Sequence, residues 1–408
     1  YSLESKKLKL IDLPSPTTNR VAGFSWSSNG VLLVDHESDT AIDRWLYTVN
    51  PKNNRVKEIW HDHRETRIYT SVASAWHSDG KRVVFLSDMK DRYGLYLLTP
   101  GEKKPKLLTN DLFDVTSKPI INSTSKRIFF QSNEPSPYER HIYYLTEKDE
   151  ISTRVSSLPG QHRPYPSPDG MKVALLHSSD MSPTELYLKD TRNDLPESKI
   201  TTSPSAEFFE RSFVQARYAT FDSKIDDHTI HARILEPRKI KRGKRYPVIF
   251  GPAYSNTVRN RWSGTTALLQ RLLVERGYIV IQVDVRGITG YGRKFREDFL
   301  MDFAGKDLED LESAVDYLST LPYVDTERIG IWGSSYGGTL TIYSMLKKPG
   351  LFKAGVAGAA AVDPFFFGTD DVAIVRRPQS HPEAFNRGAL QYANNLEDHL
   401  LIIHGMQD

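Results

Sequence analysis

The first half of the chain repeats one pattern of polar and apolar positions four times. Each unit has a polar turn, a short apolar run and a second apolar run that contains a tyrosine. The turns are Ser27–Gly30, His77–Gly80, Asn122–Ser125 and Ser167–Gly170, spaced 50, 45 and 45 residues apart. The runs are Val31–Val34 and Trp45–Val49, Arg82–Leu86 and Leu95–Leu98, Arg127–Gln131 and Ile142–Leu145, and Lys172–Leu176 and Leu186–Lys189. Asn-Gly and Asp-Gly turns favour hairpins. A period of this length with several short strands is typical of β-propeller blades.

We therefore predict a partial β-propeller of about four blades over residues 1–203, with a β-sandwich as the alternative. Four blades rarely close a large ring, and the start of the chain, Tyr1–Leu13, has no Met and resembles the interior of a domain. We accordingly expect further blades before residue 1. The composition changes near Thr201–Pro204, where we place the end of the propeller.

The second half, residues 204–408, has a different pattern. Thr229–Leu235 alternates like a half-buried strand, whereas Tyr246–Phe250 and Tyr278–Val285 are continuous apolar runs, as expected of strands buried on both faces. Apolar residues at helical spacing predict a helix over Asp307–Thr320, with Asp307 as its N-cap. Shorter segments predict strands at Ile329–Trp332 and Leu400–His404 and a helix at Tyr336–Lys348. Alternating strands and helices indicate an α/β domain with a mostly parallel sheet.

The strongest chemical motif is Gly333-Ser334-Ser335-Tyr336-Gly337, which lies between a predicted strand and a predicted helix. This G-x-S-x-G pattern in that context predicts a nucleophile elbow, in which Ser335 is exposed above the sheet. The backbone N–H of Tyr336 would stabilise an oxyanion, and the Ser334 hydroxyl is expected to point inward. The alternative is an ordinary glycine-rich turn.

Asp408 follows the last predicted strand and fits the chain order Ser–Asp–His of an α/β-hydrolase triad. It would orient the imidazole of the general base, or else it is a solvated loop aspartate. No histidine follows Asp408 in this sequence. We therefore expect the catalytic histidine to lie beyond this residue and a polypeptide of residues 1–408 to be inactive.

Composition narrows the remaining choices. The chain has 408 residues, 39% hydrophobic and 26% charged, which is ordinary globular composition. Its net charge of +3 argues against nucleic-acid partners. It has no cysteine, which excludes disulfides, thiolate metal sites and a cysteine nucleophile. No apolar run is long enough to span a membrane. The sequence does not distinguish a periplasmic from a cytoplasmic location.

The sequence resembles the prolyl oligopeptidase family of serine peptidases, in particular its dipeptidyl peptidase IV and acylaminoacyl peptidase branches. The resembling stretches are Tyr246–Ile249, Asp284–Gly292, Leu321–Asp325, Arg328–Gly338 and His404–Asp408. The resemblance implies a β-propeller followed by an α/β-hydrolase domain, with Ser335 as nucleophile and Asp408 as the acid of the triad. It implies short peptide substrates and no metal or cofactor, and it leaves a homodimer open.

The resemblance also implies how substrate is held. Tyr254 is the nearest match to a tyrosine whose hydroxyl forms the second half of the oxyanion hole, although its register differs by about one residue; loop packing is the alternative. Tyr336, Phe366 and Phe367 would line an aromatic pocket that suits proline or a small apolar side chain. Core or interface packing could equally explain Phe365–Phe367.

Two other functions fit the sequence less well. An esterase or amidase could use the same elbow, because the elbow serves any acyl transfer. A binding protein that works through its propeller would need a degraded triad, yet Ser335 and Asp408 are both present. The glutamate pair by which dipeptidyl peptidases hold a free amine cannot be matched here, so exopeptidase and endopeptidase action stay undecided.

Overall fold

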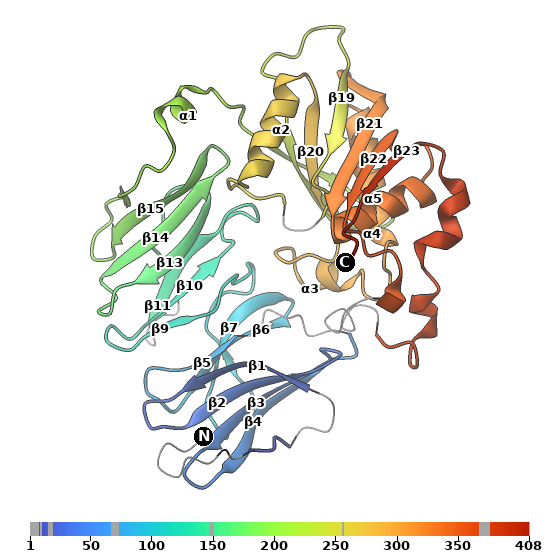
Figure 1. Cartoon of the computed structure of the whole chain (residues 1–408). Helices are drawn as coiled ribbons and strands as arrows, with labels where there is room; N and C mark the ends of the chain where they lie inside the picture. The colour runs from blue at the N-terminus through green and yellow to red at the C-terminus, as the bar shows by residue number, and fades with distance from the viewer. Residues whose placement is uncertain are drawn as a thin grey trace.

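The computed structural model describes residues 8, 10–14, 19–66, 73–146, 151–254, 257–366 and 376–407 (Figure 1). In the first half, the described residues form four four-stranded antiparallel sheets, each with its strands in chain order. They contain β1 (Asn19–Trp26), β2 (Leu32–Ser38), β3 (Asp43–Asn50) and β4 (Arg55–His63); β5 (Ser74–Trp76), β6 (Val83–Lys90), β7 (Arg92–Leu98) and β8 (Lys106–Leu107); β9 (Ile120–Asn122), β10 (Arg127–Ser132), β11 (His141–Thr146) and β12 (Thr153–Arg154); and β13 (Gln161–Pro166), β14 (Lys172–Ser179), β15 (Ser182–Asp190) and β16 (Ser198–Lys199).

These sheets coincide with the four units of the sequence period. In every sheet the predicted polar turn joins the first strand to the second, and the two predicted apolar runs lie in the second and third strands. Consecutive sheets pack face to face through those middle strands. Leu33 and Leu46 of the first sheet join Val83 and Phe85 of the second in one apolar cluster, and similar clusters join the second sheet to the third and the third to the fourth. This packing agrees with a propeller and not with a two-sheet sandwich.

The second half contains a seven-stranded sheet with the order β17-β18-β20-β19-β21-β22-β23. Its strands are β17 (Arg217–Asp222), β18 (Thr229–Leu235), β19 (Tyr246–Phe250), β20 (Ile279–Asp284), β21 (Val324–Ser334), β22 (Ala354–Gly358) and β23 (His399–Ile403). The helices are α1 (Ala206–Glu210), α2 (Thr265–Glu275), α3 (Arg293–Glu297), α4 (Lys306–Ser319) and α5 (Tyr336–Lys347), with 3-10 turns at Pro364–Phe366, Pro382–Phe385 and Ala389–Asn395. The strands β20, β19, β21, β22 and β23 pair in parallel with their neighbours in this order, whereas β17 pairs antiparallel with β18 and β18 pairs antiparallel with β20. The predicted mostly parallel α/β domain is confirmed.

Side chains of β20 alternate between the two faces of this sheet. Ile279, Ile281 and Val283 belong to the main core with residues of α4 and α5. Val280 belongs to a separate cluster with Val274 of α2. The period of two along a strand therefore gives each face its own helical cover.

One position that recurs in all four small sheets contacts the second half of the chain. In each small sheet, a polar residue at or beside the turn between the second and third strands contacts the second half. The contacts are Asp39 with Arg377, Asp88 with Arg296, Glu139 with Asn260 (3.1 Å) and Asp180 with Arg233 (2.8 Å). The Asp88–Arg296 and Asp180–Arg233 pairs are buried.

In the part of the chain that the structure describes, no helix is both long and apolar enough to cross a membrane.

Three buried histidines lie side by side in the third and fourth sheets. The ring centroids of His141 and His162 are 5.1 Å apart, and those of His162 and His177 are 4.7 Å apart. Burial lowers the pKa of His162 to about 3 and also lowers that of His177. The folded protein therefore resists protonation of groups that titrate near pH 6.5 in an unfolded chain.

We predict that His162→Asn makes the protein less sensitive to acid. A folded-state pKa below the unfolded value contributes stability above pH 6.5, and this contribution is lost as the pH falls from about 6.5 toward 3. Urea unfolding at pH 7 and pH 5 should show a smaller loss of unfolding free energy in the variant than in the parent. The exposed His399→Asn serves as control, and an equal loss in all three proteins would contradict the prediction.

Candidate active site

Ser335 occupies a strained turn between β21 and α5. Its backbone has φ 56° and ψ −128°, in a left-handed conformation that a non-glycine residue rarely adopts. Its N–H donates to the carbonyl of Gly358 at the end of β22 (3.0 Å), which fixes the turn against the neighbouring strand. Ser335 is exposed. This geometry is that expected of a nucleophile elbow.

The glycines of the motif are required by close backbone contacts. A Cβ on Gly333 would lie 2.5 Å from the backbone of Gly337, and one on Gly338 would lie 2.5 Å from the carbonyl oxygen of Gly358. A Cβ on Gly337 would overlap the carbonyl oxygen of Ala253. The turn can therefore form only where three backbone segments approach without side chains between them.

The elbow lies where the strand order changes direction. β20, the next strand in the chain after β19, pairs with one edge of β19, and the following strand, β21, pairs with its other edge. Open α/β sheets bind ligands at such a switch point, beyond the carboxyl ends of the strands. The register pairs Ser334 with Gly358 and Gly358 with Ile403, so β21, β22 and β23 end at the same level. Residues 404–407 leave β23 at that edge, and the predicted triad acid Asp408 lies outside the described residues.

Tyr254 lies beside the elbow, on the loop after β19. The N–H of the preceding Ala253 donates to the carbonyl of Trp332 in β21 (2.8 Å), which holds this loop against the strand before Ser335. Tyr254 has φ 108° and is 41% exposed, and its ring centroid is 5.3 Å from that of Tyr336. The two tyrosines that we predicted for the oxyanion hole are thus neighbours, while the role of the Tyr254 hydroxyl stays a prediction.

Tyr336 is held at both ends. As the first residue of α5 it has a backbone N–H that the helix itself cannot satisfy, as an oxyanion donor requires. Its hydroxyl donates to the carboxylate of Asp307, and its ring packs against Phe303 (5.5 Å between centroids). The prediction that Asp307 caps its helix is wrong, because Gly305 is the N-cap of α4. The Asp307 carboxylate is fully buried and anchors the tyrosine instead.

The other residues predicted near the site are Ser334 and the phenylalanines Phe365–Phe367. Ser334 is exposed at the end of β21, beside Gly358 of β22, so the expectation that it points inward is wrong. Phe365 is 61% exposed and its ring lies 5.0 Å from that of Phe385. Phe367 and the side chain of Phe366 lie outside the described part of the structure, so their place in an aromatic pocket stays a prediction.

A buried aspartate that the sequence reasoning missed holds the loop after β19. Asp284, fully buried at the end of β20, accepts hydrogen bonds from the N–H groups of Thr257 (2.9 Å) and Val258 (3.1 Å) and from the hydroxyl of Tyr291 (2.8 Å). It also pairs with the Arg259 guanidinium. The motif Asp284–Gly292 contains this residue, but only the fold shows which loop it contacts.

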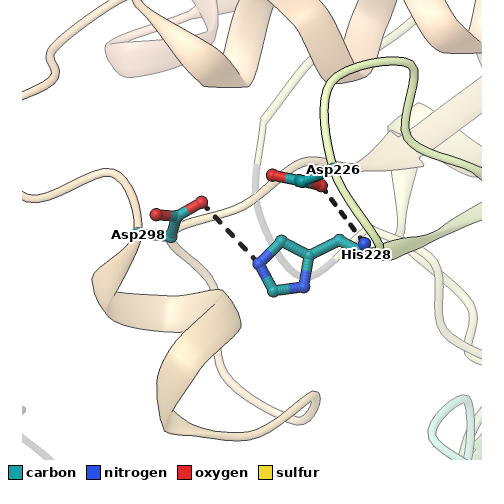
Figure 2. A group of neighbouring side chains, drawn as sticks. All are labelled: Asp226, His228 and Asp298. Carbon is teal, nitrogen blue, oxygen red and sulfur yellow. Dashed lines mark hydrogen bonds and ion pairs between the residues drawn. The ribbon is translucent and has the colours of Figure 1, made fainter.

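Asp226, His228 and Asp298 bring possible metal ligands within 4.8 Å of one another (Figure 2). His228 Nε2 lies 3.7 Å from Asp298, and the backbone N–H of His228 donates to the carboxylate of Asp226 (3.1 Å). However, the fully buried guanidinium of Arg286 pairs with both carboxylates, at 2.7 Å from Asp226. Lys306 also pairs with Asp298 (2.8 Å). Because both carboxylates already have cationic partners, we interpret the cluster as an ion-pair network.

Gly337→Ala tests whether the close approach to Ala253 shapes the elbow. We predict at least ~2 kcal/mol of destabilisation, since the new methyl group must displace backbone. Denaturant unfolding measures the change. Gly23→Ala is the control, because a Cβ there would meet its nearest atom at 4.0 Å. A loss as small as in the control would contradict the prediction.

Asp307→Asn should change how stability depends on pH. Burial raises the pKa of Asp307 to about 7, and the nearby carboxylates of Asp310 and Asp302 add to this. A folded-state pKa above the unfolded value contributes stability that is present below about pH 4 and is lost as the pH rises through 7.

The variant lacks this titration. The difference in unfolding free energy between variant and parent, measured by urea unfolding, should therefore shift in favour of the variant between pH 5 and pH 8. Asp316→Asn, exposed on the same helix, should show no such difference between the two pH values. A parent and variant that differ equally at both pH values would contradict the assignment.

Two family models match the chain. The model of the prolyl oligopeptidase family matches residues 265–408, and the model of the dipeptidyl peptidase IV N-terminal region matches residues 1–184. Among curated proteins, human dipeptidyl peptidase 8 is 25% identical over 313 residues, which cover 71% of this chain and 34% of the relative. Dipeptidyl-peptidase 5 of Porphyromonas gingivalis is 23% identical over 438 residues, with coverage of 97% and 60%.

Solved structures share the fold. The crystal structure of Porphyromonas gingivalis dipeptidyl peptidase 4 matches with a TM-score of 0.89 at 24% identity, over 99% of this chain and 58% of that one. A Bacteroides ovatus structure matches with a TM-score of 0.86 at 21% identity, over 99% and 61%. The chain spans between about a third and three fifths of the length of these relatives. Residues 265–408 are therefore similar to the prolyl oligopeptidase family, and residues 1–184 are similar to the N-terminal region of dipeptidyl peptidase IV.

Proposed function

We propose that this chain carries the nucleophile of a serine peptidase that cleaves short peptides. The observation that supports this most is the exposed Ser335 in a left-handed turn at the switch point of the sheet, with Tyr254 and Tyr336 beside it. The turn has the steric features that an activated serine needs, and its position matches the place where such sheets bind substrates.

In the proposed reaction, the Ser335 hydroxyl attacks the scissile carbonyl while a histidine takes its proton. The Tyr336 N–H and the Tyr254 hydroxyl donate to the oxyanion, whose charge they stabilise as it forms. The histidine then protonates the leaving amine, and the acyl-enzyme is hydrolysed by water. Within the described residues no histidine bonds to the Ser335 hydroxyl, and we propose that the base follows Asp408 in the chain, with Asp408 orienting it.

The names of the relatives suggest the substrate. We propose release of dipeptides, as in the dipeptidyl peptidases that this chain resembles, with a preference for proline in the aromatic pocket of Tyr336, Phe366 and Phe367. The four small sheets would be blades of a larger propeller that ends near residue 203 and admits only short peptides. Assembly into a homodimer is a further proposal.

Labelling with a fluorophosphonate probe tests the nucleophile. In the natural full-length protein we expect labelling that Ser335→Ala abolishes, with peptidase turnover reduced on the order of 10^6-fold. Ser334→Ala is the matched control, because it removes an exposed hydroxyl one residue away and should leave labelling intact. Labelling that survives Ser335→Ala would reject this serine as the nucleophile.

A substrate panel tests the specificity. Gly-Pro and Ala-Pro chromogenic dipeptides should be cleaved, whereas their N-acetylated forms should not, if dipeptides are released from a free N-terminus. Turnover of simple esters without turnover of peptides would favour the esterase alternative. A polypeptide of residues 1–408 alone should hydrolyse none of these at enzymatic rates, since it lacks a histidine after Asp408.

A further inference from the structure

A small cavity lies where the two halves of the chain meet. It has a volume of about 220 Å³, and its lining includes Asp114, Gln131 and Arg140 from the first half and Arg259, Arg261 and Gly290 from the second. None of these residues is proposed to contact the substrate, although Arg259 pairs with the Asp284 that holds the loop after β19. Side chains with N–H groups are prominent in this lining.

Arg140 is a buried cation without a carboxylate partner. It is 7% exposed, and its Nη1 donates to the carbonyl oxygens of Pro137 (2.9 Å) and Glu139 (2.6 Å). Among the residues that the structure describes, no carboxylate forms an ion pair with it, and its Nη2 has no acceptor. A buried guanidinium is normally paired, because the cost of removing its charge from water is otherwise uncompensated. Its free nitrogen therefore marks the cavity as a place for an acceptor.

A second guanidinium approaches the same point. A methyl group on Gly290, which has φ +104°, would lie 3.3 Å from Nη2 of Arg140 and 3.3 Å from Nη2 of Arg259. The two nitrogens are thus no more than twice that distance apart, on the open side of a residue without a side chain. Asn133 Nδ2 lies 3.9 Å from the same position, and one of its two N–H groups donates to the carbonyl of Gly290 (3.1 Å). Three donors from two domains converge on one small space.

The charges around this space are unbalanced. Arg259 is paired with Asp284, and Arg92 is paired with Asp114 (3.1 Å), whose carboxylate also accepts the N–H of Tyr93. Neither Asp114 nor Asp284 forms an ion pair with Arg140. Burial and the charge of Arg259 lower the pKa of Arg140 to about 9. An anion in the cavity would favour the charged form of Arg140, and so would offset both the cost of its burial and the repulsion from Arg259.

We propose that this cavity binds one small anion, a carboxylate or an inorganic anion such as chloride, bridging Arg140 of the propeller half and Arg259 of the hydrolase half. Charge-assisted hydrogen bonds to two guanidinium groups would hold it, with Asn133 as a neutral third donor. Because the ligand contacts both halves, its binding should stabilise their association as well as the fold. The proposal does not depend on the peptidase activity.

Chloride binding can be measured directly on the natural full-length protein by the broadening of the ³⁵Cl NMR line in sodium chloride. We expect saturable broadening that Arg140→Gln weakens at least tenfold in affinity. Arg192→Gln is the matched control, because Arg192 is an exposed arginine paired with Asp190 and its loss should leave the broadening unchanged. Equal broadening in all three proteins would overturn the site.

Acetate distinguishes the two sources of the anion. If added acetate displaces chloride, or if calorimetry detects acetate binding that Arg140→Gln removes, the site accepts carboxylates; if acetate has no effect, the ligand is inorganic. Absence of binding by both anions to the parent protein overturns the proposal. Should Arg140→Gln fail to fold by circular dichroism, anomalous diffraction from bromide-soaked crystals of the parent decides instead. A bromide peak between Arg140 and Arg259 is expected, and an empty cavity contradicts the proposal.

Discussion

The close contact between the turn at Ser335 and the loop after β19 is the constraint on which the candidate site depends. Gly337 lies against the carbonyl of Ala253, so the helix α5 begins directly beside the residue that leads into Tyr254. Any side chain at that contact would separate the serine from one proposed oxyanion donor. The other donor, the N–H of Tyr336, belongs to the first turn of the same helix. One backbone contact therefore sets the spacing of all three groups.

Buried ion pairs support the loops around that contact. Asp284 fixes the start of the segment that follows Tyr254, and Asp310 pairs with the fully buried Arg286 at the end of β20. Loops that leave a sheet have few apolar contacts to fix them, and an aspartate that accepts several N–H groups can fix a backbone path. Such pairs stabilise only when each charge is compensated. Arg140 departs from this rule, which is why the cavity beside Gly290 differs from the rest of the interface.

Local patterns in the sequence predicted the elements and the strained turn at Ser335 but not the residues that contact them. The four-fold period located the middle strands of every small sheet, because each turn and apolar run is encoded within about twenty residues. The elbow at Ser335 was equally local. In contrast, Asp307 was interpreted as a helix cap, since its contact with Tyr336 joins residues far apart in the chain. Arg140 and Arg259 could not be related at all, because only folding brings a propeller turn to the loop after β19. The roles of Asp408, Phe366 and Phe367 remain predictions from the resemblance.

The first half contacts the second through the same hairpin of every small sheet, at Asp39, Asp88, Glu139 and Asp180. Attachment is thus part of the repeating unit and does not depend on one special sheet. When a gene segment that encodes one unit is duplicated or lost, an attachment point is gained or lost with it. Propellers with different numbers of units could in this way have evolved on one type of catalytic domain, without a new interface having to arise at each step.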